Sequence, residues 1–243
     1  MLDFLLSKIN DFGLVDKFFS KLYNKQREKE IGNENYKRIE LRKNEDETWV
    51  CFLPWRVSFK EANKLGFIPK NGRVIVYEGP IGLTNPNPNK AKDLLERLVA
   101  DLKSLKLPNF SVLALSIGTY PGFYVANSFN VKKLVAVVPG SKLGSCIYGG
   151  IATQGVRQRA ILFGIKDSKQ YDSLIIGTNP IENLNNLPED IEIHLANQDF
   201  FIPTIYGEEL IGKLDELNKK YRIFRYDKGH VLTLYQFGRN NTL

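Results

Sequence analysis

Three residues of the kinds that carry out nucleophilic catalysis each follow a stretch with the pattern of a strand. Ser116 comes directly after the apolar run 110–115, Asp199 follows the run 191–195, and His230 follows the run 222–226. A serine hydroxyl is a weak nucleophile at neutral pH until an imidazole accepts its proton. Brought together, a serine, a histidine and an acid would support acyl transfer through an acyl-serine intermediate.

Ser116 stands at the tightest strand-to-helix junction of the sequence, Leu113-Ala-Leu-Ser-Ile-Gly-Thr-Tyr-Pro-Gly122. This junction resembles the nucleophile elbow, G-x-S-x-G, of the α/β hydrolases, where small flanking residues allow a strained turn. Gly118 fits that pattern, whereas Ala114 stands where the family usually has glycine. A serine that only caps the following helix is the alternative interpretation.

The loops that carry the acid and the histidine extend this resemblance. The segment 196–203 is similar to the acid loop of the family, with Asp199 followed by a proline, and the segment 227–230 is similar to its histidine loop, with Gly-His before the last helix. Family members carry serine, acid and histidine in this order. The resemblance therefore implies a catalytic triad of Ser116, Asp199 and His230. A loop aspartate that caps a turn is the alternative for Asp199.

His194 is the other of the two histidines in the chain. It lies inside a predicted strand, and we interpret it as a satisfied sheet residue rather than a base.

The resemblance also implies an oxyanion hole of two backbone N–H donors. The residue after the nucleophile, Ile117, supplies one. The segment 77–82 resembles the family's His-Gly oxyanion segment, with Glu78 in place of the histidine. Because Pro80 has no N–H, we expect Ile81 or Gly82 to supply the second donor. A Gly- and Pro-rich turn without a catalytic part is the alternative.

The alternation of strand and helix patterns predicts an α/β protein with a mostly parallel central sheet and helices on both faces. Together with the motifs, it indicates the α/β-hydrolase fold. Two further strand-like runs, 36–41 and 48–55, are separated by turn-forming residues and predict an N-terminal antiparallel hairpin. The expected elements are strands 73–77, 110–115, 133–138, 191–195 and 222–226 and helices 89–105, 120–127, 205–221 and one from 231 onward.

The chain divides into an N-terminal segment, 1–35, and a hydrolase domain, 36–243. Residues 2–24 carry apolar side chains at helical spacing, followed by a charged connector. We favour a helix that packs on the domain over a membrane-surface or dimer role. The stretch 139–188 predicts irregular structure where relatives carry a small cap, which is the part that usually sets substrate choice.

Composition describes an ordinary globular protein with 43% hydrophobic and 25% charged residues. The net charge of +7 comes from scattered basic residues, which favours a solvated surface, and we expect no nucleic-acid partner. Two cysteines outside metal-ligand spacing predict neither a disulfide framework nor a metal site. We also expect no cofactor, a small-molecule acyl substrate and a cytoplasmic location, and the sequence assigns no oligomeric state.

The leading functional hypothesis is a serine hydrolase that acts on an ester, a thioester or a small amide. The alternatives are a fold-retaining binding protein with an idle triad, which Ala114 and Pro80 favour, and an acyltransferase that uses the same serine. A dinucleotide-binding function lacks its G-x-G-x-x-G motif after any strand.

Overall fold

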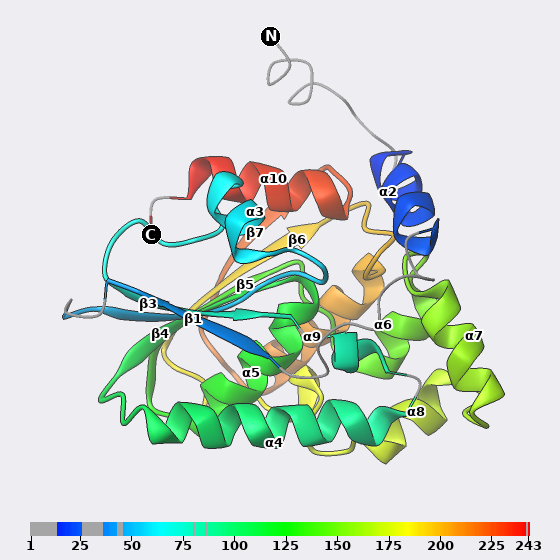
Figure 1. The fold of residues 1–243 in the computed structure, drawn as a ribbon, viewed down its shortest axis with the longest axis horizontal. Helices are drawn as coiled ribbons and strands as arrows, with labels where there is room; N and C mark the ends of the chain where they lie inside the picture. The colour runs from blue at the N-terminus through cyan, green and yellow to red at the C-terminus, as the bar shows by residue number, and fades with distance from the viewer. Residues whose placement is uncertain (1–13, 26–35, 43–45, 80, 86, 242) are drawn as a thin grey trace, which may run out of the picture.

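The computed structural model describes residues 14–25, 36–42, 46–79, 81–85, 87–241 and 243. Its centre is a twisted sheet in which the described strands follow the order β1-β3-β2-β4-β5-β6-β7 (Figure 1). All neighbouring strands are parallel except β1 and β3. The strands are β1 (Lys37–Leu41), β2 (Thr48–Phe52), β3 (Arg73–Glu78), β4 (Phe110–Leu115), β5 (Val131–Val137), β6 (Asp190–Ala196) and β7 (Arg222–Tyr226).

The central strands are apolar along their length because helices cover both faces of the sheet. Along β4, Val112 and Ala114 point into the core on one face, while Leu113 and Leu115 point into the core on the other. Figure 1 shows α4, α5 and α9 on one face and α3 and α10 on the other. These helices are α3 (Phe59–Lys64), α4 (Pro88–Ser104), α5 (Thr119–Ser128), α9 (Thr204–Glu216) and α10 (His230–Asn240). The predicted α/β architecture is therefore confirmed.

The predicted N-terminal hairpin is wrong in its pairing. β1 is antiparallel to β3, and β2 lies between β3 and β4, parallel to both. Every residue of β2 is buried, as a central strand requires, whereas β1 is partly exposed, as suits an edge. The turn-forming residues after β1 thus lead to a strand that is not its neighbour in the sheet.

The stretch 139–188, predicted as irregular, contains three short helices, α6 (Leu143–Gly149), α7 (Gln154–Leu162) and α8 (Ser168–Leu174). Two short 3-10 turns lie elsewhere, η2 (Ile81–Thr84) and η3 (Ser116–Gly118), and a third, η4 (Pro180–Glu182), ends this stretch. Glycines obscure the helical pattern, and Gly144 is needed because a side chain there would lie 2.7 Å from the carboxylate of Asp172. We call residues 139–188 the helical insert.

Only α2 (Leu14–Lys25) of the N-terminal segment falls within the described residues, and it contacts α10 (Figure 1). The rest of the predicted amphipathic stripe and the connector lie outside them. Among the helices that the structure describes, none is long and apolar enough to cross a membrane.

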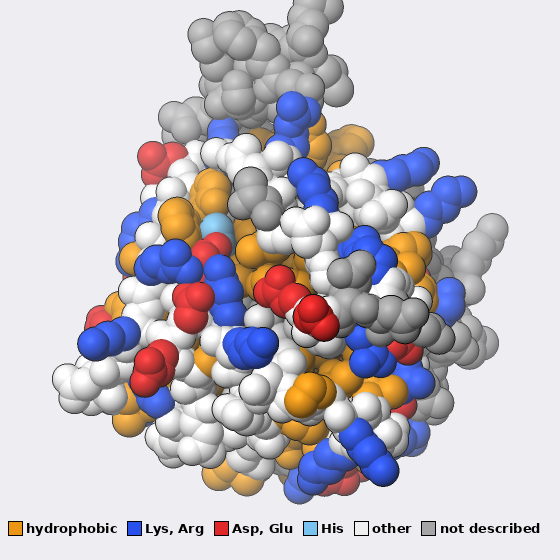
Figure 2. Space-filling model, turned by 90° about the vertical axis from the view of Figure 1, so that its left-hand side faces the viewer, with side chains coloured by type: hydrophobic (Ala, Val, Ile, Leu, Met, Phe, Trp, Pro, Cys, Tyr) orange, Lys and Arg blue, Asp and Glu red, His pale blue; other side chains and the backbone are white. Residues whose placement is uncertain are grey.

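Basic residues are scattered over the surface. On the face shown in Figure 2, lysines and arginines lie among acidic side chains instead of forming one patch. Several form ion pairs, such as Arg38 with Asp101 at 2.6 Å and Lys133 with Glu192 at 3.2 Å. Lys133 and Glu192 are partly buried, whereas an exposed pair such as Arg38 with Asp101 contributes little to stability.

Candidate active site

Ser116 occupies a strained turn at the carboxyl end of β4. Its φ is 55°, in the left-handed region that residues with a side chain seldom adopt. The chain turns there through η3 directly into α5, and Ser116 lines a cavity. Such strain persists only where the surrounding structure imposes it, and it clusters at functional sites.

The residues around Ser116 are small because backbones meet there. A methyl group built at Gly118 would overlap the carbonyl oxygen of Phe52 on β2. Likewise, a methyl group built at Gly122 would overlap the side chain of Ala114. Ala114 therefore fits the turn because its partner on α5 is a glycine.

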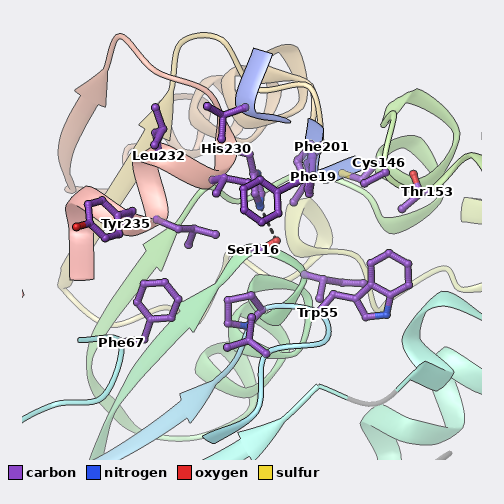
Figure 3. Close-up of a pocket in the computed structure, with 18 of the residues that line it drawn as sticks. Phe19, Trp55, Phe67, Ser116, Cys146, Thr153, Phe201, His230, Leu232 and Tyr235 are labelled. Carbon is purple, nitrogen blue, oxygen red and sulfur yellow. Dashed lines mark hydrogen bonds between the residues drawn. The ribbon is translucent and has the colours of Figure 1, made fainter. Parts of the chain in front are cut away.

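His230 reaches Ser116 from the first position of α10. Its Nε2 lies 2.7 Å from Ser116 Oγ, although the two residues are 114 positions apart in the chain (Figure 3). The imidazole is only 2% exposed, and it stacks on the ring of Phe201 with centroids 5.1 Å apart. This packing holds the ring in the plane that its hydrogen bonds require.

Asp199, in the loop after β6, lies on the far side of the imidazole from Ser116. Its Oδ2 is 2.7 Å from His230 Nδ1. Its Oδ1 accepts hydrogen bonds from the backbone N–H groups of Phe201 and Ile202, each at 2.8 Å. The carboxylate is thus held on both oxygens, so that the structure brings together all three residues of the predicted triad in one hydrogen-bonded chain.

Two opposing effects act on the pKa of His230. Burial alone lowers this pKa, but the charge and hydrogen bond of Asp199, with the charge of Asp16, outweigh burial and raise it above its ordinary value. Asp16, on α2, also accepts a hydrogen bond from the backbone N–H of His230 at 2.8 Å. Asp16 was not among the residues predicted from the sequence, because nothing near it in the chain indicates this contact.

The predicted oxyanion donors fall at two places. Ile117 follows Ser116 and lines the same cavity. Ile81 and Gly82 begin η2 after β3, a strand that β2 separates from β4. Pro80 lies outside the described residues, and the Glu78 carboxylate accepts a hydrogen bond from Phe59 N–H at 2.7 Å.

The strand order directs attention to another loop, 53–57, which follows β2. β2 is the direct neighbour of β4, and Pro54, Trp55 and Val57 line the cavity with Ser116. The strand predicted over 48–55 includes the first residues of this loop, which the structure places after β2. The available indication was the run of apolar residues in β2, which is typical of a central strand.

His194 lies on β6 as expected. Its Nδ1 is 2.8 Å from the Tyr226 hydroxyl and its Nε2 is 2.9 Å from the Glu192 carboxylate. Both nitrogens are thus engaged within the sheet.

Cys146, on α6, lines the cavity, but burial raises the pKa of its thiol far above the ordinary value. A neutral thiol is a poor nucleophile. Among the described residues, no group of three or more His, Cys, Asp or Glu side chains could hold a metal ion.

A cavity of about 470 Å³ opens beside Ser116 and His230. Its walls come from α2, the loops after β2 and β6, the helical insert and α10, and apart from His230 the described lining residues carry no charged side chain. In the view of Figure 3, Ser116 lies between two groups of lining side chains, with Phe67, Leu232 and Tyr235 on one side and Trp55, Cys146 and Thr153 on the other.

No protein-family model matches the chain, and no curated protein matches its sequence. Solved structures match most of it. An α/β-hydrolase enzyme from a Medee basin deep-sea metagenome library is 14% identical, with a TM-score of 0.53, over 86% of this chain and 95% of that chain. A lipase-esterase related protein from Clostridium acetobutylicum is 14% identical, with a TM-score of 0.53, over 84% of this chain and 95% of that chain.

The capsule O-acetyltransferase of Neisseria meningitidis serogroup A, solved in complex with CoA, is 10% identical, with a TM-score of 0.59, over 86% of this chain and 91% of that chain. The similarity to these structures covers 84–86% of this chain. The chain therefore has the α/β-hydrolase fold.

Proposed function

We propose that this protein is a serine hydrolase that cleaves uncharged, apolar esters through an acyl-serine intermediate. The observation that carries the proposal is the chain of hydrogen bonds from Ser116 Oγ through His230 to Asp199, which starts at a serine with a φ of 55°. A strained backbone and three buried polar side chains oppose folding, and nucleophilic catalysis is the use for which this combination is suited.

Ser116 would attack the ester carbonyl carbon while His230 Nε2 takes the proton from Ser116 Oγ. The protonated imidazole then gives that proton to the leaving alcohol, and the acyl group stays on Ser116. In the deacylation step, His230 takes a proton from a water molecule as the water oxygen attacks the acyl carbon. The carboxylic acid leaves, and the proton returns to Ser116. Asp199 orients the imidazole and stabilises its charged form throughout.

We assign the oxyanion donors to the backbone N–H of Ile117 and to a backbone N–H of the loop 53–57. Ile117 lies just before the positive end of α5, which favours the developing negative charge. The loop follows the strand next to β4, and its Trp55 lines the cavity. The competing assignment to Ile81 or Gly82 requires η2 to reach across from the end of β3.

The cavity supports an apolar, uncharged substrate. A volume of about 470 Å³ is within the usual range for a small-molecule site. Transfer of a charged group from water into such surroundings is costly without a partner. The described lining residues include no Lys or Arg to pair with the phosphates of a large thioester donor. Thioesters and small amides therefore come second to simple esters.

Acyl transfer to an acceptor other than water would use the same acyl-serine. The similarity in fold to an O-acetyltransferase supports an acyltransferase as the second candidate. Product analysis by mass spectrometry with an added alcohol separates the two: a hydrolase transfers most acyl groups to water and releases the free acid, whereas an acyltransferase transfers most of them to the alcohol and forms a new ester.

Steady-state hydrolysis of p-nitrophenyl esters tests the proposal. Turnover by the wild type that Ser116→Ala abolishes supports it. Absence of turnover with every neutral ester would favour the idle binding protein.

A further inference from the structure

The carboxylate of Asp16 lies completely buried against the loops that carry the triad acid and base. The residue has an exposed fraction of 0%. Its Oδ2 accepts hydrogen bonds from the backbone N–H groups of His230 at 2.8 Å and Phe200 at 3.3 Å. Its Oδ1 accepts one from Val231 N–H at 3.0 Å. One carboxylate on α2 thus joins the loop of Asp199 to the start of α10.

Asp16 acts as a remote cap for α10. The N-cap residue of this helix is Gly229, which has no side chain to bond the first N–H groups. A carboxylate satisfies these donors and its negative charge is favourable at a helix N-terminus. Asp16 provides it from 214 positions away in the chain.

Gly229 supplies independent support for this contact. Its φ of −75° and ψ of 177° are open to any residue, so the backbone conformation does not require glycine. Glycine is required for lack of space, because a Cβ at position 229 would lie 2.8 Å from Asp16 Oδ2. The contact with the Asp16 carboxylate therefore explains why glycine stands at position 229.

We infer that Asp16 is a positioning residue for catalysis: by bonding the backbone at His230 and Phe200, it makes the docking of α2 part of the assembly of the active site. The inference rests on the proposed function for its catalytic consequence. Other residues of α2 agree with it, since Val15 and Phe19, on either side of Asp16, line the substrate cavity. Helix α2 thus lines the cavity through Val15 and Phe19 and bonds the backbone of His230 through Asp16.

The charge of Asp16 also reaches His230. On the elements around the imidazole, the described side chains that are titratable or charged are Asp16, Lys17 and Lys21 on α2, Asp199 in the acid loop, Cys146 and Tyr148 on α6, Asp227 and Lys228 before α10, and Tyr235 and Arg239 on α10. Of these, Asp199 and Asp16 raise the pKa of His230. Removal of the Asp16 charge should therefore lower this pKa, whereas a purely structural role for Asp16 would leave it unchanged.

An NMR titration of the full-length chain tests this effect without any need for turnover. The chain has two histidines, so the His230 imidazole signals are assigned by comparison with His194→Gln. We expect His230 to titrate at lower pH in Asp16→Ala than in the wild type. Lys21→Gln, an exposed change on the same helix, should leave the midpoint where it is.

A double-variant cycle tests the contact itself. Displacement of the histidine loop should reduce kcat/KM of Asp16→Ala by about 10- to 100-fold, since small misplacements of catalytic groups are costly. Gly229→Ala should cause a similar loss by pushing the carboxylate away. In the Asp16→Ala background, Gly229→Ala should cost little more, because the methyl group then has room.

Asp16→Asn keeps the side-chain volume and one acceptor oxygen but removes the charge, and it replaces Asp16→Ala in the NMR titration if the alanine variant folds poorly. An unchanged His230 midpoint in these variants, or a Gly229→Ala loss of equal size with and without Asp16, would overturn the inference. A wild type that titrates as expected but hydrolyses no ester would instead overturn the proposed function alone.

Discussion

Gly122 on α5 packs against the side chain of Ala114 on β4, and a methyl group at Gly122 would overlap that side chain. Overpacking at such a contact typically costs about 1–3 kcal/mol. Gly122→Ala should therefore lower the free energy of unfolding by that amount, measured by urea denaturation. Adding Ala114→Gly should recover part of the loss, because it removes the atom that the new methyl group meets.

Gly212→Ala is the matched control for this pair. Gly212 lies within α9, and a Cβ there would meet nothing within 4 Å. Alanine in a helix interior is favoured over glycine by about 0.5–1 kcal/mol, so this variant should gain stability. Equal stability of Gly122→Ala and wild type would show that the approach of α5 to β4 is looser than described.

Substitution of the triad residues should remove turnover in a chain that still folds. Ser116→Ala and His230→Ala should each lower kcat for a p-nitrophenyl ester by several orders of magnitude, and Asp199→Asn by a comparable or smaller factor. The three groups act as a unit, so the double variant Ser116→Ala/His230→Ala should lose little more than either single one. If Cys146→Ala abolished turnover while Ser116→Ala retained it, the nucleophile would be the cysteine.

The pH dependence of kcat/KM should follow His230. Burial alone lowers the pKa of this imidazole, yet the charge of Asp199 prevails and raises it above 6.5. Only the neutral imidazole can accept the serine proton, so activity is lost as the pH falls through the raised pKa. The acid limb of kcat/KM should have its midpoint above 6.5. A midpoint well below that value would mean that burial dominates.

Two adjacent aromatic residues on α2 test the cavity. Phe19 lines it, whereas Phe18 is 62% exposed. Phe19→Ala should raise KM for long-chain p-nitrophenyl esters about tenfold, in line with the loss of an apolar contact, and should change KM for the acetate less. Phe18→Ala should leave both values near those of the wild type. Equal effects of the two variants would place the acyl chain elsewhere.

Charge discrimination offers a further test of the same cavity. A neutral ester should be hydrolysed with a kcat/KM on the order of 10² or more above that of a matched ester with a free carboxylate, because a buried, unpaired charge costs several kcal/mol. A preference for the charged ester would require a basic group at the cavity that the described residues do not supply.

A boronate or phosphonate complex of Ser116 tests the oxyanion hole. The inhibitor oxygen should lie about 2.7–3.1 Å from the N–H of Ile117 and from an N–H of the loop 53–57. A contact from Ile81 or Gly82 in place of that loop would restore the assignment made from the sequence.

The sequence predicted the parts of the site that depend on local pattern. Ser116, Asp199 and His230 each follow a predicted strand within a few residues, and parallel strands end at one edge of a sheet. Pairing of β1 was predicted wrongly because strand order is not local. The prediction of Ile81 and Gly82 rested on the resemblance of segment 77–82 to an oxyanion segment, and the local sequence does not show that β2 lies between β3 and β4.

Asp16 could not be found from its own surroundings. Its partner His230 lies 214 positions away, and α2 reads as an ordinary amphipathic helix. The indication of Asp16 in the sequence is Gly229, but its close contact with the Asp16 carboxylate becomes apparent only when the backbone angles of Gly229 are known.

Fluorophosphonate labelling with peptide mapping by mass spectrometry tests the central claim most directly. A fluorophosphonate reacts with a serine only when a neighbouring base activates it. We predict one adduct per chain, on the peptide that contains Ser116, abolished in Ser116→Ala and in His230→Ala and retained in Cys146→Ala. Folded wild-type protein that remains unlabelled, or an adduct on any other residue, would contradict the assignment of Ser116 as an activated nucleophile.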